Sequence, residues 1–578
     1  MSEKQRHEQE QHRIGVYVCQ CGTNIAKMVD CDSVAGEIAD MPGVTVSRSY
    51  KYMCSNPGQE MIMADIKEHN LDRVVVAACS PHMHEVTFRK AVQAADLNPY
   101  YLEIANIREQ CAWVHDDRAK ATSKAKDLAT AAVERVVWQE ALEKMSVDMC
   151  PNCLVIGGGI AGMTAALDLA EAGGRVYLVE RQDHLGGQVA HIDLTAPYLD
   201  SARDIIDERV TRVMQHPQID VMLQSELEEL GGFVGNFQAV VGSADGTQQT
   251  LDVGSVVVAT GYKTFDAARI PNYGYGRLPN VITSLELERM LREGRVETKE
   301  GRAPQYVALL HCVGSRSLEY NSYCSRVCCM AALKYAHEVK SSVPGCYVSD
   351  VYIDMHAFGK GHEDLYRRTS EANTMFLMYD KDDFPAIRKA NPGDDCDMLI
   401  EVNETLSGET IEIPADLVVL MVGMEARDDC RELARLVNIS VDKHGWFIES
   451  HPKLDPVATT TDGIYIAGAC QAPKDIPDSV AQARAAAARI MARIAHGEIE
   501  IDAVYSEIDA DKCSGCRVCN ALCPYVAIEY DPATHKSHVI SALCKACGAC
   551  VAACPSSAIT ARGFTDEQIF AQIEGVLG

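Results

Sequence analysis

Long hydrophobic runs are missing from this 578-residue sequence. No stretch approaches the ~20 consecutive apolar residues that a membrane-spanning helix needs. The first segment, Met1–Arg13, is polar and has no apolar region of the kind found in secretory signal sequences. We therefore expect a soluble, cytoplasmic protein that does not enter a membrane.

An excess of basic residues is also missing, because 82 Asp and Glu residues outnumber 54 Lys and Arg residues and leave a formal net charge of -28. Nucleic acids and anionic lipids attract basic surfaces. The charge balance therefore argues against both as partners and favours other proteins and small redox molecules.

Cysteine, in contrast, is abundant, with 24 residues. Reducing compartments keep thiols free, so disulfides do not explain this number in a cytoplasmic protein, whereas metal binding does. We therefore expect many of these cysteines to bind metal. The chain is long enough for three or four globular domains at roughly 150 residues each.

Two cysteine runs near the C-terminus have the spacing of bacterial ferredoxins. The runs are Cys513-x2-Cys516-x2-Cys519-x3-Cys523-Pro524 and Cys544-x2-Cys547-x2-Cys550-x3-Cys554-Pro555. In such runs three thiolates bind one 4Fe-4S cluster and the fourth binds the other cluster. The predicted ligand sets are Cys513, Cys516, Cys519 and Cys554 for one cluster, and Cys544, Cys547, Cys550 and Cys523 for the other. Structural zinc would instead require separate CxxC pairs.

Residues 154–180 have the pattern of a dinucleotide-binding fold: an apolar strand, a glycine-rich turn, a helix and a second strand that ends in an acid. Gly157, Gly159 and Gly162 occupy the G-x-G-x-x-G positions, which allow a tight turn, close approach of the backbone to a pyrophosphate, and close packing of helix on strand. We expect Glu180, at the end of the second strand, to accept hydrogen bonds from an adenosine ribose.

Three further motifs indicate that the dinucleotide is FAD. They are Gly186-Gly187-Gln188, the strand and turn at residues 256–261 that end in Ala-Thr-Gly, and the returning segment at residues 461–468. The Asp that usually follows this last glycine and binds the ribityl chain of the flavin is Ala469 here. The predicted cofactor-binding residues are Gly157, Gly159, Gly162, Glu180, Gly187, Gln188, Thr260, Gly261, Gly468 and Ala469.

A second dinucleotide fold, for NAD(P)H, normally accompanies such a flavin domain. Its turn should follow the predicted strand at residues 306–310, but the sequence there is His311-Cys312-Val313-Gly314, with a single glycine. Such a turn cannot hold a pyrophosphate well. Because further cysteines follow closely, we predict a third cluster in place of the nicotinamide, bound by Cys312, Cys324, Cys328 and Cys329. The alternative is a group of buried or redox-active thiols.

The N-terminal residues, from 14 to about 140, form a separate predicted α/β unit in which cysteines follow apolar runs. The carboxyl ends of parallel strands share one edge of a sheet. We therefore expect Cys21, Cys54, Cys79 and Cys111 to converge there and to bind a fourth cluster. Cys19 competes with Cys21 for the first ligand position, and ordinary buried cysteines are the alternative.

Motifs along nearly the whole chain resemble those of the A subunit of heterodisulfide reductase. They include VYVCQCGTNI, CSNPGQE, VVVAACSPHMHEVTFR, ANIREQCAWVH, VIGGGIAGMTAAL, CVGSRS, YCSRVCCMAALKYA and GACQAPKDIPDSVAQA. The resemblance implies an α/β protein with an N-terminal cluster domain (1–145), a thioredoxin-reductase-like FAD-binding fold of two dinucleotide domains with its own cluster (146–500), and a ferredoxin domain with two 4Fe-4S clusters (501–578).

The resemblance also implies an oxidoreductase subunit that transfers electrons between a flavin and cluster chains. Its expected partners are B- and C-like subunits and an electron-donating hydrogenase, formate dehydrogenase or similar module, with a homodimer inside the larger complex. Larger members carry an extra ferredoxin module, but residues 201–300 contain no cysteine, which argues against electron bifurcation. The alternatives are an NAD(P)H-dependent enzyme like the small subunit of glutamate synthase, and a non-catalytic electron-wire scaffold.

Overall fold

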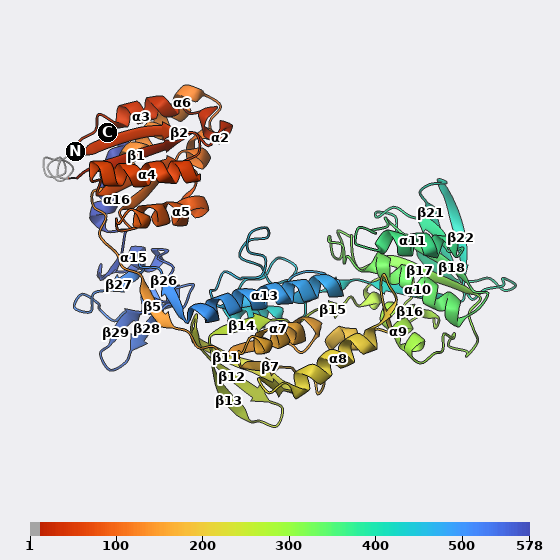
Figure 1. Ribbon diagram of the computed structural model, residues 1–578. Helices are drawn as coiled ribbons and strands as arrows, with labels where there is room; N and C mark the ends of the chain where they lie inside the picture. Colours follow the sequence, from red (N-terminus) through yellow and green to blue (C-terminus); the bar gives the residue numbers. More distant parts are fainter. Residues whose placement is uncertain (1–11, 578) are drawn as a thin grey trace. The chain divides into compact units, whose positions relative to one another are not determined.

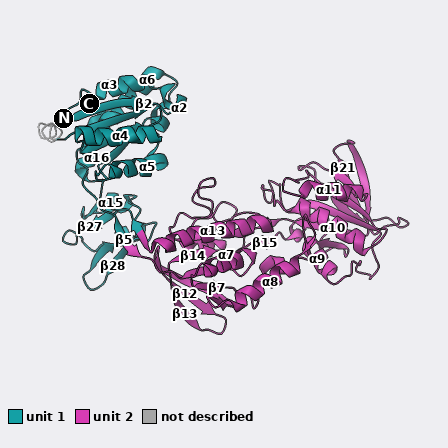
Figure 2. Cartoon of the chain, in the orientation of Figure 1, with its two compact units in different colours: residues 1–146, 500–578 teal, residues 147–499 magenta. Residues whose placement is uncertain are grey.

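A computed structural model describes residues 12–577 (Figure 1). The chain forms two compact units, one made of residues 1–146 and 500–578 and the other of residues 147–499 (Figure 2). The polar segment Met1–Arg13, for which we expect no signal sequence, lies outside the described residues except for His12 and Arg13. No helix within residues 12–577 has the length and apolar character needed to cross a membrane.

The first unit begins with a four-stranded parallel sheet. The spatial order is β2 (Val44–Tyr50), β1 (Ile14–Cys19), β3 (Arg73–Ala78) and β4 (Leu102–Asn106). Alternate strand residues bury against α3 (Cys31–Ile38) and α6 (Arg118–Val136) on one face, and against α4 (Asn56–His69) and α5 (Pro81–Ala94) on the other. All four strands therefore end at one edge, as the sequence predicts.

The C-terminal segment completes the same unit. Strands β27 (Ser506–Ile508) and β30 (Ile559–Ala561) pair, as do β28 (Ile528–Asp531) and β29 (Lys536–Val539). The short helices α14 (Val518–Leu522) and α15 (Ala549–Ala553) pack together, and α16 (Asp566–Leu577) packs on α6. Gln568 Nε2 donates to Trp138 O at 2.9 Å, and Arg135 donates to Gly563 O at 2.8 Å.

The second unit holds two parallel sheets, each of the dinucleotide-binding type. The first has the order β10 (Ile219–Met222), β7 (Val176–Val179), β6 (Cys153–Ile156), β14 (Ser255–Val258) and β25 (Ile464–Ile466). Helices α7 (Ile160–Glu171), α8 (Ala202–Gln215) and α13 (Ile476–His496) cover one face. Strands β11 (Ser225–Phe233), β12 (Asn236–Ser243) and β13 (Gln248–Val253), with α12 (Cys430–Leu436), cover the other.

The second sheet has the order β16 (Val281–Thr283), β23 (Leu417–Val422), β17 (Tyr306–Val313), β18 (Tyr347–Tyr352) and β19 (Met375–Met378). Helices α9 (Ser284–Arg292) and α10 (Cys328–Ser342) pack on one face, and α11 (His362–Glu371) packs on α10. The other face is covered by β20 (Ala386–Lys389), β21 (Met398–Glu404) and β22 (Glu409–Ala415). The chain passes between the sheets near β15 (Lys263–Thr264) and β24 (Met424–Glu425), which pair.

Candidate functional site

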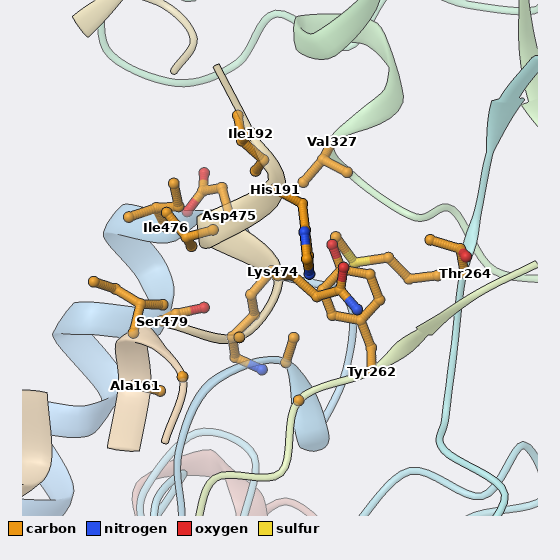
Figure 3. Close-up of a pocket in the computed structure, with 18 of the residues that line it drawn as sticks. Ala161, His191, Ile192, Tyr262, Thr264, Val327, Lys474, Asp475, Ile476 and Ser479 are labelled. Atoms are coloured by element: carbon orange, nitrogen blue, oxygen red, sulfur yellow. The ribbon is translucent and has the colours of Figure 1, made fainter. Parts of the chain in front are cut away.

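A cavity of about 1050 Å³ opens in the second unit, at the carboxyl ends of β6 and β14. Figure 3 shows part of its lining. Eight of the ten predicted cofactor-binding residues line it: Gly157, Gly159, Glu180, Gly187, Gln188, Thr260, Gly261 and Ala469. The other two are packing positions, since a Cβ on Gly162 would lie 1.8 Å from Gly157 O and one on Gly468 would lie 2.7 Å from Ala161 Cβ.

The cavity wall has the features that a bound dinucleotide requires. A Cβ on Gly159 would meet nothing closer than Gly187 Cα at 4.0 Å, so this backbone is open to a ligand. Helix α7 begins directly after it and presents unpaired N–H groups. The buried hydroxyl of Thr260 has no hydrogen-bond partner, as expected of a group that a ligand would satisfy. These residues fit FAD.

The Glu180 carboxylate is held in place by the backbone. Its Oε2 accepts from Gly158 N at 2.6 Å and its Oε1 from Gln182 N at 2.8 Å. A carboxylate has about four acceptor positions, so two bonds leave capacity for the hydroxyl groups of a ribose.

Lys334 and two carboxylates form a buried charged group beside the cavity that the sequence patterns did not single out. The ammonium contacts Glu288 directly and lies 3.5 Å from Glu338 Oε2, and each of the three side chains is at most 5% exposed. Burial raises the pKa of Glu338 to about 7, and Lys334 opposes the shift. No signal in the sequence marks this group, because its members come from two different helices.

The four cysteines of the predicted third cluster lie close together at the edge of the second sheet. Cys312 is near the end of β17, Cys324 is in the following loop, and Cys328 and Cys329 are the first two residues of α10. Cys312, Cys324 and Cys329 each interact electrostatically with Cys328. Cys328 also lines the large cavity. The structure therefore brings the four predicted ligands together and places one of them against the dinucleotide site.

The surroundings of these cysteines determine whether the neutral thiol or the charged thiolate form is stable. Burial, followed by the charge of Cys329, raises the pKa of Cys312 to about 12. Thiolates here need a cationic partner, which a metal ion supplies. His311 provides positive charge nearby: burial disfavours its charged form, but the ion pair with Asp350, at 2.6 Å, outweighs burial and raises the pKa of His311 to about 10.

Five cysteines named in the prediction lie near the edge of the N-terminal sheet. Cys19 interacts electrostatically with Cys21 and Cys54, and Cys79 with Cys21 and Cys19. Cys111 is fully buried on the α6 side of the sheet. Burial raises the pKa of Cys111 to about 11, and Lys124 and Asp127 have smaller effects. The structure thus brings Cys19, Cys21, Cys54 and Cys79 near one another, and Cys21 also packs against the core cluster that contains Cys111.

In the C-terminal segment, a small hollow is lined by Cys523, Cys544, Cys547 and Cys550. This is the second ligand set predicted from the spacing, including the crossover of Cys523. Three of the predicted ferredoxin ligands accept a backbone N–H group at 3.3 Å. Ala527 N donates to Cys523 Sγ and Ser506 N to Cys544 Sγ, both in the second set, and Ala558 N donates to Cys554 Sγ in the first. Such bonds to sulfur tune the reduction potential of a cluster.

Comparison with known families agrees with this geometry. A family model described as "Pyridine nucleotide-disulphide oxidoreductase" matches residues 151–314. Another, described as "4Fe-4S dicluster domain", matches residues 506–555. The fold and these sites therefore define an oxidoreductase that contains a flavin and 4Fe-4S clusters.

Two relatives align with nearly the whole chain. The iron-sulfur A subunit of the "CoB--CoM heterodisulfide reductase" of Methanocaldococcus jannaschii is 39% identical over 652 positions, which cover 98% of each chain. The A subunit of the "H(2)/formate:CoB-CoM heterodisulfide,ferredoxin reductase" of Methanococcus maripaludis is 38% identical, also with 98% of each chain covered. The chain belongs to the family of heterodisulfide reductase A subunits, as the sequence motifs predict.

Two further observations complete the comparison. The 652 aligned positions exceed the 578 residues of this chain, so the relative contains segments that this chain lacks. Among solved structures, a thioredoxin reductase of T. acidophilum is 16% identical, with a TM-score of 0.41, and the alignment covers 60% of this chain and 100% of that chain.

Proposed function

We propose that this chain binds FAD in the cavity of the second unit and passes electrons between the flavin and four 4Fe-4S clusters, as the A-type component of a heterodisulfide-reductase-like complex. FAD supplies the change between two-electron and one-electron chemistry. The observation that carries the proposal is the position of Cys328, a predicted cluster ligand that lines the same cavity as Gly159 and Thr260. A cluster bound there would adjoin the flavin.

The protein residues have separate tasks in this proposal. The turn at Gly157 and Gly159 and the start of α7 would bind the pyrophosphate. Glu180 would bind the ribose, and Thr260 would donate or accept through its unpaired hydroxyl. Cys312, Cys324, Cys328 and Cys329 would hold the cluster next to the cavity.

The two ferredoxin clusters would use Cys513, Cys516, Cys519 and Cys554, and Cys544, Cys547, Cys550 and Cys523. For the N-terminal cluster we propose Cys21, Cys54 and Cys79, with Cys19 better placed than Cys111 to be the fourth ligand, because it interacts with the other thiols. The iron contents of Cys19→Ala and Cys111→Ala variants test this choice. Iron lost only from Cys111→Ala would restore the ligand set predicted from the strand ends.

The names of the relatives support the choice of partners. One of them names hydrogen, formate, a CoB-CoM heterodisulfide and ferredoxin as its reactants. We propose that the present chain likewise works with B- and C-like subunits and with a hydrogenase or formate dehydrogenase module, as a homodimer within the complex. Anaerobic co-purification with a tagged chain tests this, and recovery of the chain without such subunits would contradict it.

Two alternatives predict different behaviour. An NAD(P)H-dependent enzyme needs a pyrophosphate site after β17, where this chain has a cysteine and one glycine. A purely structural wire needs no active flavin. We do not propose electron bifurcation, because splitting an electron pair needs a separate low-potential exit and residues 201–300 contain no cysteine.

The deciding experiment is anaerobic reduction of the purified chain while the visible flavin band is recorded. We expect the band to bleach fully, with two electrons taken up by each flavin beyond those taken up by the clusters. A Gly159→Val variant, without bound FAD, is the matched control and should take up only the electrons of the clusters. A flavin that stays oxidised while the clusters are reduced would favour the scaffold.

A further inference from the structure

A cation without a carboxylate partner projects at the wall of the flavin cavity. Lys474 lines this cavity, and Figure 3 shows it together with His191 and Tyr262. Its ammonium donates to Gln471 Oε1 at 2.5 Å and to Ala472 O at 3.5 Å, and no ion pair of Lys474 occurs within residues 12–577. Burial lowers the pKa of Lys474.

The carboxylates near Lys474 are engaged elsewhere. Glu449 and Asp478 attract the ammonium and Arg326 repels it. Glu449, however, accepts from Gln471 Nε2 at 2.7 Å, and Asp478 accepts from Arg326 at 2.6 Å. A partly buried charge without compensation is costly, so an anionic ligand in the cavity would find a ready partner here.

Other cations on the cavity wall are paired or exposed. Arg326 pairs with Asp478, Lys334 with Glu288, and both Arg181 and Arg427 with Asp429. Lys360 is exposed to solvent. Lys474, in contrast, is partly buried and has no ion pair with a carboxylate within residues 12–577.

The position of Lys474 indicates which part of FAD it would meet. Arg326, which lies two residues before Cys328, donates to Pro473 O at 3.4 Å, so Lys474 lies toward the cysteine end of the cavity. Lys474 also precedes α13, whose N-terminus adds positive potential. The acidic residue usual after Gly468 is Ala469 here. The nearby carboxylates have other partners, since Asp475 accepts from Asp478 N and Asp478 accepts from Arg326.

We propose that the Lys474 ammonium binds the pyrimidine edge of the flavin, the N1 and C2 carbonyl side that becomes negative on reduction, and thereby makes this flavin easier to reduce. Charge placed near N1 is one of the means by which a protein tunes a flavin. The inference rests on the proposed FAD site and adds to it the residue that sets the potential. Lys474 acts by stabilising charge and takes no part in bond making.

The test compares Lys474→Met, Lys474→Gln and Lys474→Arg with the wild-type chain, purified anaerobically. We expect both neutral variants to retain FAD but to show an at least tenfold smaller equilibrium constant for flavin reduction, a decrease of about 30 mV for a two-electron couple. Lys474→Arg should restore most of the shift. Lys360→Met, which removes an exposed lysine from the same cavity wall, should leave the flavin potential unchanged.

Two results would overturn this assignment. The first is an unchanged flavin potential in both neutral variants. The second is loss of FAD from a variant whose thermal unfolding and iron content match the wild type, because it would place Lys474 at the phosphates instead. The glutamine variant can still donate a hydrogen bond to Gln471. The measurement therefore remains possible if the methionine variant does not fold. Absence of FAD from the wild-type chain would contradict the proposed function and not the role of Lys474 alone.

Discussion

One cavity is lined both by Cys328, the first residue of α10, and by Gly159, the residue before α7. The two helices pack on different sheets of the second unit. Cys328 is a predicted cluster ligand and Gly159 a predicted contact of the FAD pyrophosphate. In the proposed arrangement, one cavity would connect the flavin, which carries out two-electron chemistry, with a cluster that transfers single electrons.

This relationship predicts the effect of Cys328→Ala. The variant should keep FAD but lose about four iron atoms per chain, and electron transfer between the flavin and the partner subunits should stop. Stopped-flow reduction by the co-purified donor measures the transfer. Cys346→Ala, which removes another buried thiol outside the group, is the control. Unchanged iron and unchanged transfer in Cys328→Ala would leave this thiol a packing residue.

The iron content of the whole chain tests the number of clusters. Four 4Fe-4S clusters correspond to about sixteen iron atoms per chain, together with one FAD. Chemical iron analysis of anaerobically purified protein checks this value. About eight iron atoms would restrict the clusters to the ferredoxin segment and make the remaining cysteine groups ordinary buried thiols.

Gly159→Val should abolish FAD binding and leave the ferredoxin clusters intact, because the new side chain would occupy the space that the pyrophosphate needs. The absorbance spectrum and the iron content report the two properties separately. Gly231→Val is the matched control, since a Cβ there also meets nothing within 4 Å but the position does not line the cavity. Yellow protein from Gly159→Val would show that the FAD site is misassigned.

NADH and NADPH should not reduce this flavin directly, because Cys312 and a single glycine replace the pyrophosphate-binding turn after β17. Stopped-flow mixing under anaerobic conditions measures the rate, with dithionite as the positive control for a reducible flavin. Rapid bleaching by either nucleotide would favour an enzyme like the small subunit of glutamate synthase.

The buried carboxyl of Glu338 should make stability depend on pH. Its pKa rises from an unfolded value of 4.5 to about 7 in the folded state, so the folded protein binds more protons between these values. Stability then falls as pH rises through this window, by about 3 kcal/mol in total. Thermal release of FAD, followed by fluorescence at pH 5 and pH 8, measures the effect. The dependence should weaken in Glu338→Gln and persist in Glu371→Gln, an exposed control.

Residue spacing predicted the ferredoxin cysteine sets and the glycine turn of the FAD site, because local backbone geometry determines both. The ferredoxin runs require a crossover, and the structure groups Cys523 with Cys544, Cys547 and Cys550. The glycine positions of the FAD turn likewise follow from backbone approach alone, and the cavity forms around them. In both cases the chemistry lies within a few residues of one strand, turn or helix.

The N-terminal cysteines show where such reasoning stops. Strand ends predicted one shared edge. Cys111 lies five residues beyond Asn106, in the single turn Arg108–Ala112, and belongs to the α6-side core cluster that Cys21 also contacts, so strand position alone does not identify the fourth ligand. Cys19 is still within β1, with its side chain in the core on the α4 and α5 side. The path of a turn after a strand is determined by tertiary packing. The same holds for Lys474, whose surroundings come from distant segments.

The pairing of α6 with α16 has a consequence for the order in which the protein is made. Arg135 and Gly563, which this pairing brings into hydrogen-bonding contact, are separated by 428 residues, so α16 must be synthesised before the packing around α6 is complete. Residues 147–499 emerge earlier and contain their own core. Domains fold as units during synthesis. We therefore expect the second unit to fold and bind its flavin before the N-terminal domain, which is translated first, completes its fold.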